Sequence, residues 1–373
     1  MNYDILIATR NRAAALRMSI PMMLTQSRRP SRLIVADCSD DHAEIAATVQ
    51  ELALQHGVPA VVLNPPAGKA RQLNHGLEHV QSPVVMVPDD DSLWFPDTAE
   101  QIMQVYERDD ADIIGAVCAA ESPDLPQDQA DRSRQQQQQQ KQKQAQSYRM
   151  TWTDQARQML AHPRQRFERR YCPDPFLLHG RACWQGKPVP TWLYEMDAVL
   201  VEWMTGFRMS FRTDLIRSVG FDERLAAPSL TWVMDDVDAS FNILRDRLIV
   251  GARRAKVHHY RWPSRRGSGM AMGVTQVLMA AYVICKHTTP DAPVRRQLAG
   301  YARMKLMKYL AAAHTPFGRD RVRGAWRASR CIPDLLKAEP EHLATRYHEA
   351  VARCLNVSLE ATPQPPDTAL NHR

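Results

Sequence analysis

Three consecutive aspartates, Asp89, Asp90 and Asp91, follow directly after the apolar run Val84-Val85-Met86-Val87. In extended backbone, residues two apart point to one side, so we expect Asp89 and Asp91 to face together and Asp90 to face away. Two adjacent carboxylates disfavour each other's charged form, and a divalent cation relieves this. Hard oxygen ligands favour Mg²⁺ or Mn²⁺, which also contact substrate phosphates. Three aspartates alone could form a plain acidic turn, but their position after a buried strand favours a metal site.

A second acidic group, Asp235, Asp236 and Asp238, opens a helix that we expect over 235–247. A helix N-terminus stabilises each carboxylate by ~0.3–1 kcal/mol, so these residues could serve the helix alone. The functional interpretation is that one of them is an ionised general base beside a phosphate site. The sequence thus offers two acidic sites, far apart in the chain, that one fold would have to bring together.

Short apolar runs alternate with helical stretches over the first third of the chain, which predicts βαβ units and a buried parallel sheet of the α/β class, with helices on both faces. The runs are 5–8, 33–36, 60–63 and 84–87, and a fifth begins at 113–114. Ligands of such sheets bind beyond the carboxyl ends of the strands. We therefore expect the polar residues that follow or approach these strand ends to bind a ligand: Thr9, Arg12, Asp37, Lys69, Arg71, Asp89 and Asp90.

The rest of the chain divides by composition. Residues 1–120 form the first half of the sheet domain; 201–262 return to strands and helices (209–211, 213–219, 235–247, 255–257) and form its second half; 263–373 are mainly helical and basic (273–287, 293–313, 340–354). Between the two halves, 121–200 is an expected insertion. Its glutamine-rich tract at 135–144 cannot bury enough apolar surface to offset ordering, which predicts disorder there.

The 373 residues are 44% hydrophobic and 24% charged, with a net charge of +7. This excludes a wholly disordered, collagen-like or disulfide-dense small protein. From Gly251 onward, 21 Lys and Arg face 8 Asp and Glu, which leaves +13 in the C-terminal part. The basic region is not interleaved with base-stacking aromatics, so no nucleic-acid partner is expected. Its amphipathic basic helices instead indicate peripheral contact with an anionic membrane surface, or packing on the catalytic domain.

Seven scattered cysteines without a CxxC pair are typical of a reducing compartment. We find no signal peptide, because Asp4 interrupts any apolar N-terminal stretch. The most apolar segment, 274–285, is shorter than a membrane span. These observations predict a cytoplasmic protein, with the inner face of the membrane as the expected place of any lipid contact.

Six segments, read in order, resemble the motifs of family 2 glycosyltransferases with the GT-A fold. The four N-terminal ones are ILIATRNR, LIVADCSDD, GKARQLNHGL and VVMVPDDDSLWFPD. The later two are EWMTGFRMSFRTDLIRSVGFDERL and MDDVDASFNILRD. The resemblance covers about residues 3–118 and 202–260, and it rests on the order and spacing of all six segments.

The resemblance implies a nucleotide-diphospho-sugar donor, Mg²⁺ or Mn²⁺, and inverting single displacement by a hydroxyl of a saccharide or lipid-linked acceptor. Cell-surface polysaccharide or glycolipid synthesis is the process it implies. It also implies that 1–120 is the nucleotide-sugar-binding half and 201–262 the acceptor or catalytic half, and that the strand-end residues named above bind the donor. By position, Asp37 resembles the aspartate that binds the donor base, although Cys38 stands where glycine is usual. Asp89 and Asp91 match the DxD motif, with Asp91 the more direct metal ligand.

The later motifs imply the remaining roles. Asp235 and Asp236 match the family's Glu-Asp pair, with Asp235 in place of Glu and Asp236 as the general base. Trp203 and Gly206 match the Trp-x-x-Gly segment of the sugar and acceptor pocket. One of the paired histidines at 258 and 259, taken here as His258, is expected near the metal. Two alternatives stay open: a sugar-phosphate nucleotidyltransferase, although the first loop lacks the glycines usual there, and a non-catalytic nucleotide-sugar-binding protein.

Overall fold

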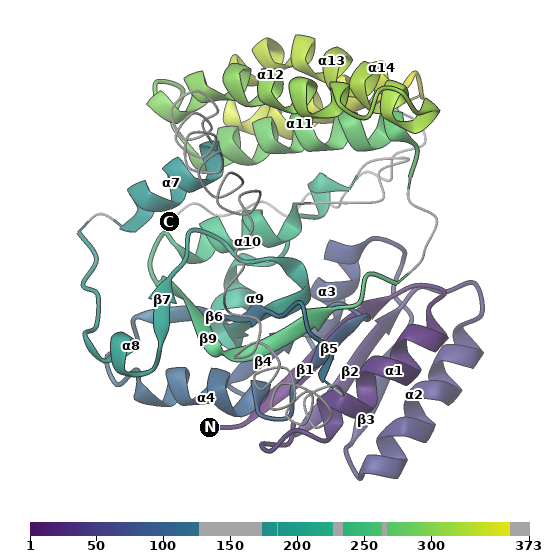
Figure 1. Ribbon diagram of the computed structural model, residues 1–373, viewed down its shortest axis with the longest axis vertical. Helices are drawn as coiled ribbons and strands as arrows, with labels where there is room; N and C mark the ends of the chain where they lie inside the picture. The colour runs from purple at the N-terminus through teal and green to yellow at the C-terminus, as the bar shows by residue number, and fades with distance from the viewer. Residues whose placement is uncertain (127–173, 185, 227–233, 263–266, 359–373) are drawn as a thin grey trace, which may run out of the picture.

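The computed structural model describes residues 1–126, 174–184, 186–226, 234–262 and 267–358. The glutamine-rich tract at 135–144, for which disorder was predicted, lies outside these residues. The described chain forms a sheet domain below a layer of C-terminal helices (Figure 1). The acidic groups at 89–91 and 235–238 both belong to the sheet domain.

The described residues form one nine-stranded mixed sheet, with strand order β3-β2-β1-β4-β8-β6-β9-β5 and β7 paired with β9. The strands are β1 Tyr3–Thr9, β2 Arg32–Asp37, β3 Ala60–Leu63, β4 Val84–Val87, β5 Ser92–Trp94, β6 Ile114–Glu121, β7 Ala198–Leu200, β8 Met209–Arg212 and β9 Leu248–His259. Strands β1 to β4, β6 and β9 run one way, while β5, β7 and β8 run antiparallel to their neighbours. The mostly parallel α/β sheet expected from the sequence is confirmed.

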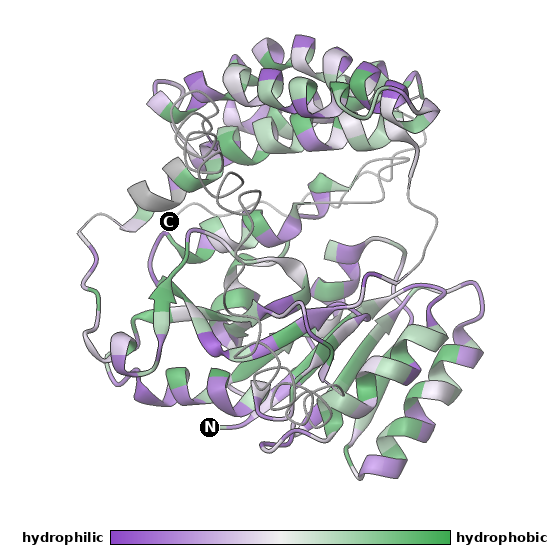
Figure 2. Ribbon diagram, in the orientation of Figure 1, coloured by the Kyte–Doolittle hydropathy of each residue, from purple (hydrophilic) through white to green (hydrophobic). Residues whose placement is uncertain are grey.

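Helices cover both faces of the sheet, because successive strand residues point to opposite sides. Ile5 and Ile7 of β1 join a core with α1 (Ala13–Leu24), α2 (His42–His56) and α4 (Thr98–Arg108). Leu6, between them, joins a core with α3 (Lys69–Leu77), α9 (Thr213–Val219) and α10 (Asp235–Ile243). In Figure 2 the sheet strands and the inward sides of these helices carry most of the hydrophobic colour.

Several element boundaries differ from the sequence expectation. Helix α10 ends at Ile243 rather than 247, and the strand expected at 255–257 is the end of the much longer β9. The described part of the expected insertion holds two helices, α7 (Pro175–Trp184) and α8 (Trp192–Glu195), and β7, which joins the sheet beside β9. Strand β9 pairs with β5, β6 and β7, which are far from it in the sequence. Local sequence periodicity therefore could not place the residue at which β9 begins.

Four helices form the C-terminal layer: α11 (Gly269–His287), α12 (Gln297–Leu310), α13 (Pro316–Leu336) and α14 (Leu343–Leu355). Helix α13 was not expected, since its glycines and internal Pro333 lower helix propensity. Those glycines instead let two backbones approach. A Cβ at Gly324 would lie 2.2 Å from the Met270 carbonyl oxygen of α11, and one at Gly273 would lie 2.2 Å from that of Arg321. Tertiary packing thus decides this helix.

Helix α11 is long and apolar enough, by length and composition alone, to cross a membrane, although the sequence analysis expected no such segment. Of its most apolar window, 78% is buried inside the protein. It lies between the sheet domain and the outer helices α12 and α13 (Figure 1). Its apolar sequence therefore serves the core between two layers.

Candidate active site

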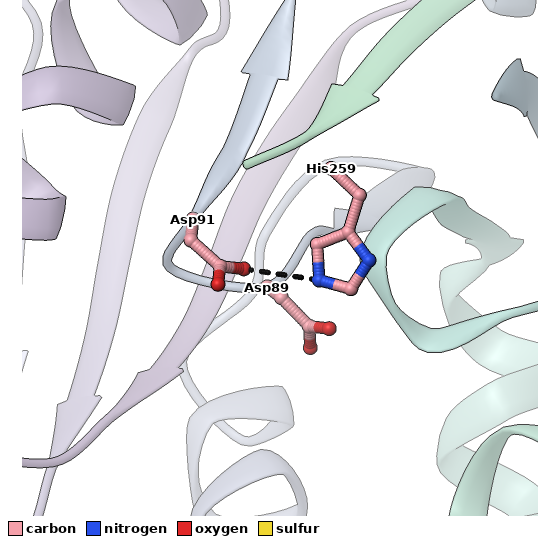
Figure 3. A group of neighbouring side chains, drawn as sticks. All are labelled: Asp89, Asp91 and His259. Carbon is pink, nitrogen blue, oxygen red and sulfur yellow. Dashed lines mark ion pairs between the residues drawn. The ribbon is translucent and has the colours of Figure 1, made fainter. Parts of the chain in front are cut away.

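Asp89 and Asp91 face one point together with His259, the last residue of β9 (Figure 3). One ligand atom from each of the three residues lies within 4.8 Å of the others. The Nε2 atom of His259 is 3.4 Å from Oδ1 of Asp91, and Oδ2 of Asp91 accepts the Trp262 backbone N–H at 2.8 Å. Both predicted carboxylates thus share one side, but through a turn and not through extended backbone, because the Ser92 N–H donates to the Asp89 carbonyl oxygen at 3.1 Å.

His259, rather than the predicted His258, accompanies the carboxylates. Neighbouring residues of a strand point to opposite sides, so only one histidine of the pair can face this point. His258 lies on the other side, with Nδ1 3.0 Å from the Ser122 carbonyl oxygen. The His259 ring stacks on Phe207, with 4.5 Å between ring centroids, which fixes its orientation.

The donor set of two carboxylates and an imidazole fits a divalent cation of the Mg²⁺ or Mn²⁺ class. Burial alone would raise the pKa of Asp91, but the hydrogen bonds from His259 and from the Trp262 N–H, with the nearby Arg12 charge, outweigh it and lower that pKa. Asp91 is thus held ionised, as a metal ligand must be. Among the described residues, this is the only cluster of at least three such side chains that could hold an ion.

Asp90 turns away from this point, as expected, and lies 4% exposed. It accepts hydrogen bonds from Thr9 Oγ1 at 2.8 Å and from Arg12 Nη1 at 2.7 Å. Burial raises the pKa of Asp90 to about 6, against the opposing effect of the Arg12 charge. Thr9, which is 3% exposed, and Asp90 were predicted to contact the donor. In the structure they instead bind each other and hold Arg12, because both are covered by the protein.

Lys69, the first residue of α3, joins the two acidic groups. Its Nζ lies 2.9 Å from Oδ1 of Asp89 and 3.6 Å from Oδ2 of Asp235. Burial alone would lower the pKa of Lys69, but the charges of Asp235 and Asp89 outweigh it and raise that pKa. A Cβ at Gly206 would lie 2.9 Å from the same ammonium, so glycine leaves the room that Lys69 occupies.

Asp235 and Asp236 open helix α10 and lie next to this ammonium. Oδ2 of Asp236 accepts the Gly206 backbone N–H at 3.0 Å, and Oδ1 accepts that of Val237 at 2.8 Å. Asp235 is 2% exposed, and its Oδ2 is buried without a hydrogen-bond partner among the described residues. Burial, followed by the adjacent Asp235 charge, raises the pKa of the half-buried Asp236 to about 7.

The two acidic groups that the sequence placed far apart thus meet, through Lys69, on one side of the sheet. The sequence analysis did not predict that Lys69 would contact both acidic groups. A carboxyl with a pKa near 7 that stays partly open is suited to exchange a proton with a bound substrate.

Two other predicted residues lie beside this centre rather than in it. Arg71 Nε is 3.3 Å from Glu223 Oε2, so its charge joins α3 to the segment before α10. Trp203 is partly buried against the core, and the following Met204 N–H donates to Ser240 Oγ of α10 at 3.0 Å. Trp203 therefore anchors the loop that carries Gly206, whereas Arg71 ties α3 to Glu223.

A cavity of about 260 Å³ adjoins Asp91, lined by Asn11, Arg12, Ser39, Asp41, Glu44 and Trp262 among others. Arg12 and Trp262 connect the two places: Arg12 Nη1 is 3.8 Å from Asp91, and the Trp262 N–H donates to that residue. Asp37, the predicted contact of the donor base, is fully buried. Its carboxylate accepts the Ser39 N–H at 2.9 Å and lies 2.8 Å from His42 Nδ1, so it supports the cavity wall from below.

Trp262, Asn11 and Ser39 were missed by the sequence analysis. Asn11 has a positive φ of 54°, which asparagine tolerates better than most residues, and its backbone N–H donates to Ser39 Oγ at 2.7 Å. This links the loops after β1 and β2. The available signal was position, because both loops follow parallel strands at the same sheet edge. Position gave no such signal for Trp262, because it follows the end of β9, which pairs antiparallel with β5.

Residues 4–162 match the family described as glycosyl transferase family 2. This segment is similar to that family, and it spans less than half of the chain. The resemblance noted in the sequence is thereby confirmed for this segment, which includes Asp89, Asp91 and Lys69. It ends before Asp235 and Asp236, whose roles stay predictions. No curated protein sequence matches this glycosyltransferase.

Solved structures with similar folds include three of interest. The mannosyltransferase PcManGT from Pyrobaculum calidifontis, in complex with GDP-Man and Mn²⁺, is 15% identical with a TM-score of 0.49; the match covers 95% of this chain and 87% of that one. S. aureus TarS is 11% identical with a TM-score of 0.48, covering 95% and 54%. TarS 1–349 with UDP-GlcNAc is 11% identical with a TM-score of 0.47, covering 96% and 93%.

Proposed function

We propose that this glycosyltransferase moves a sugar from a nucleoside-diphosphate donor to a hydroxyl acceptor with inversion, in a single displacement. The observation that carries the proposal is that Lys69 contacts both Asp89 and Asp235 on one side of the sheet, with Asp236 next to Asp235. A donor carries two phosphates beside its reacting carbon, and this arrangement places a metal-type carboxylate pair, a cation and a partly open base within one small region. The 260 Å³ cavity beside Asp91 adds space for the nucleoside.

Asp236 is the proposed general base. Its two oxygens already accept backbone N–H groups, which hold the carboxylate in one orientation. A pKa near 7 lets it take the proton of the attacking hydroxyl at neutral pH, a contribution of ~10²–10⁴ in rate. The neighbouring Lys69 ammonium offsets part of the negative charge that Asp235 and Asp89 bring to this region.

Asp89, Asp91 and His259 are the residues that would hold the divalent cation. When bound, such an ion supplies positive charge that stabilises a departing diphosphate. Arg12, held by Asp90 and lining the cavity, is placed to bind a donor phosphate or ribose from the opposite side. Trp262 offers an indole face at the same cavity for a nucleobase.

The metal site can be tested with Mn²⁺ alone, by titration calorimetry on the full chain. We expect Asp91→Asn and Asp89→Asn to weaken Mn²⁺ binding at least about tenfold, because each removes a charged oxygen ligand. Asp90→Asn is the matched control, because it makes the same chemical change on a side chain that binds Thr9 and does not face the proposed metal site. We expect it to leave Mn²⁺ binding nearly unchanged. Equal loss in all three variants would contradict the assignment.

The reaction can be tested with a panel of nucleotide-sugars and Mn²⁺. Release of nucleoside diphosphate is the expected outcome. Pyrophosphate release would indicate nucleotidyl transfer instead, and the absence of any turnover across donors and acceptors would favour a binding protein. With an active donor identified, NMR of the product should show an inverted anomeric configuration; retention would contradict the single displacement.

A further inference from the structure

Helices α12 and α13 expose apolar side chains on the surface of the C-terminal layer. Met307 is 66% exposed, Leu310 59%, Phe317 43% and Trp326 51%. These four lie within twenty residues of sequence, whereas the other large apolar side chains exposed in the described residues are scattered over the rest of the chain. Such a concentration on one surface is typical of an interaction site.

Cations surround these apolar side chains. Residues 296–337 contain 10 Lys and Arg but only 2 Asp and Glu, a net charge of +8. The exposed ones include Arg303 and Lys308 on α12, and Arg319, Arg323 and Arg330 on α13. The Arg330 guanidinium lies over the Trp326 ring, 4.9 Å from its centroid. The region would attract any anionic surface before contact is made.

Helical spacing gathers both kinds of side chain on one side of each helix. Arg319, Arg323, Trp326 and Arg330 follow each other at intervals of four, three and four, which is one helix face. The opposite face of α13, with Gly324 and its neighbours, is buried against α11.

On α12, Arg303, Met307 and Leu310 likewise share a face, while Leu298, Tyr301 and Ala302 are buried. Helices α12 and α13 pack against each other, so we treat their exposed faces together. We call this the α12–α13 face, and it consists of Arg303, Met307, Lys308, Leu310, Arg319, Arg323, Trp326 and Arg330.

We propose that the α12–α13 face binds an anionic membrane surface. Its cations can reach lipid headgroups while Met307, Leu310 and Trp326 enter the boundary with the acyl chains, the composition of an interfacial helix. Each cation near an anionic leaflet adds to the attraction. The proposal does not depend on the proposed transfer reaction.

A lipid surface fits this face better than nucleic acid does. Base stacking needs free aromatic faces, but one face of Trp326 is covered by Arg330, and the aliphatic Met307 and Leu310 provide no stacking platform. The face also lies on the side of the layer away from the sheet domain (Figure 1). Binding there leaves the catalytic residues in contact with the aqueous side.

Vesicle flotation of the full chain tests the proposal. Vesicles of phosphatidylcholine with phosphatidylglycerol should carry the protein upward at low salt, and vesicles of phosphatidylcholine alone should not. High salt should weaken the binding at least about tenfold, since an ionic attraction to a surface is screened. Flotation that is equal on both vesicles, or unchanged by salt, would overturn an electrostatic membrane site.

Paired variants locate the surface. Arg319, Arg323 and Arg330 changed together to Glu should abolish flotation, whereas the same charge change at Arg108, Arg253 and Arg254 of the sheet domain should leave most of it. For the apolar part, Met307→Glu with Trp326→Glu is compared with Leu54→Glu and Tyr194→Glu, which are 84% and 76% exposed in the wild type and lie outside the C-terminal layer. Circular dichroism confirms that each variant is folded.

Three results would overturn the proposal. The first is loss of binding that is equal in test and control variants. The second is a wild-type dimer that never floats and becomes monomeric in the Met307 and Trp326 variant, which would assign the face to a second copy of the chain. The third is tighter binding to a DNA or RNA oligonucleotide than to anionic vesicles.

Discussion

Helix α10 carries carboxylates with opposite surroundings within a single turn. Asp235 and Asp236 face Lys69 and the cavity side; Asp235 Oδ2 has no hydrogen-bond partner among the described residues, and the Asp236 pKa rises to about 7. Asp238, 0% exposed, faces α11 and accepts hydrogen bonds from Lys286 Nζ and His287 Nε2, both at 2.8 Å. Burial alone would raise the pKa of Asp238, but the Lys286 charge and the His287 hydrogen bond outweigh it and lower that pKa.

Asp222 completes the paired side. It accepts hydrogen bonds from Lys286 at 2.7 Å and from the Tyr282 hydroxyl at 2.8 Å, and it forms a salt bridge with Arg224. Burial opposes ionisation here too, yet the Lys286 and Arg224 charges lower the Asp222 pKa. On one side of α10 the Asp238 carboxylate is fully hydrogen-bonded to the C-terminal layer. On the other side Asp235 Oδ2 has no hydrogen-bond partner among the described residues. The difference indicates that the first side stabilises the fold and the second is kept for a ligand.

The largest effect that we expect, and the strongest test of the difference between the two sides of α10, is on catalysis. Asp236→Asn keeps the size of the side chain but removes the base, so we expect transfer to fall by ~10²–10⁴. Steady-state kinetics measures this, with donor affinity followed separately by calorimetry. Donor affinity should stay nearly constant; a fall in affinity as large as the fall in rate would move Asp236 to the donor site.

On the paired side, Lys286→Met should destabilise the fold by about 3–5 kcal/mol, because it leaves two buried carboxylates without their shared cation. Urea unfolding followed by circular dichroism measures the loss. Adding Asp222→Asn and Asp238→Asn to the same chain should recover part of it. If Lys286→Met were as stable as the wild type, the ion network would not hold the two layers together.

The two sides should also respond to pH in opposite directions. A raised folded-state pKa, as at Asp236, stabilises the fold at low pH, and this contribution is lost as pH rises through about 7. Asp236→Asn should therefore raise stability by about 1–2 kcal/mol near pH 8 and by little near pH 4. This is below the ~4 kcal/mol of three pKa units because the group is partly exposed.

Asp238 behaves in the reverse sense, since its lowered pKa adds stability above the ordinary aspartate range and loses it as pH falls. Asp238→Asn should accordingly cost stability near pH 8 and cost less in acid. Thermal unfolding of both variants at the two pH values measures this. Parallel pH responses of the two variants would remove the distinction between the sides.

The smallest expected effect is at Gly206. A methyl group in Gly206→Ala would come within 2.9 Å of the Lys69 ammonium, a flexible group that can move. We expect a fall of about three- to tenfold in transfer rate with stability nearly unchanged, because only the cation between the acidic groups shifts. Kinetics at saturating donor tests the rate, and urea unfolding of the same variant tests the stability; a loss of stability that accompanies the fall in rate would contradict the local effect.

The sequence alone determined the fold class, the first four strands and the acidic residues that matter. Unbroken apolar runs followed by polar residues define buried parallel strands. The sequence also predicted that Asp89 and Asp91 face together, although a turn at 90–91 brings this about and not the extended backbone that was expected. The same local rules could not decide between His258 and His259. They also predicted that Asp37, Thr9 and Asp90 would contact a ligand, whereas the structure buries all three against other parts of the protein. Burial depends on residues far away in the chain, so local rules cannot predict it.

Only the tertiary structure brought Lys69 between the two acidic groups, placed Trp262 at the cavity and separated the two sides of α10. Each of these depends on long-range pairing, of β9 with β5 and β6 or of α10 with α11, that leaves no periodic signature in the sequence. Helix α13 also depends on long-range packing. Its glycines weaken an isolated helix, but they become favourable once the backbone of α11 lies against them.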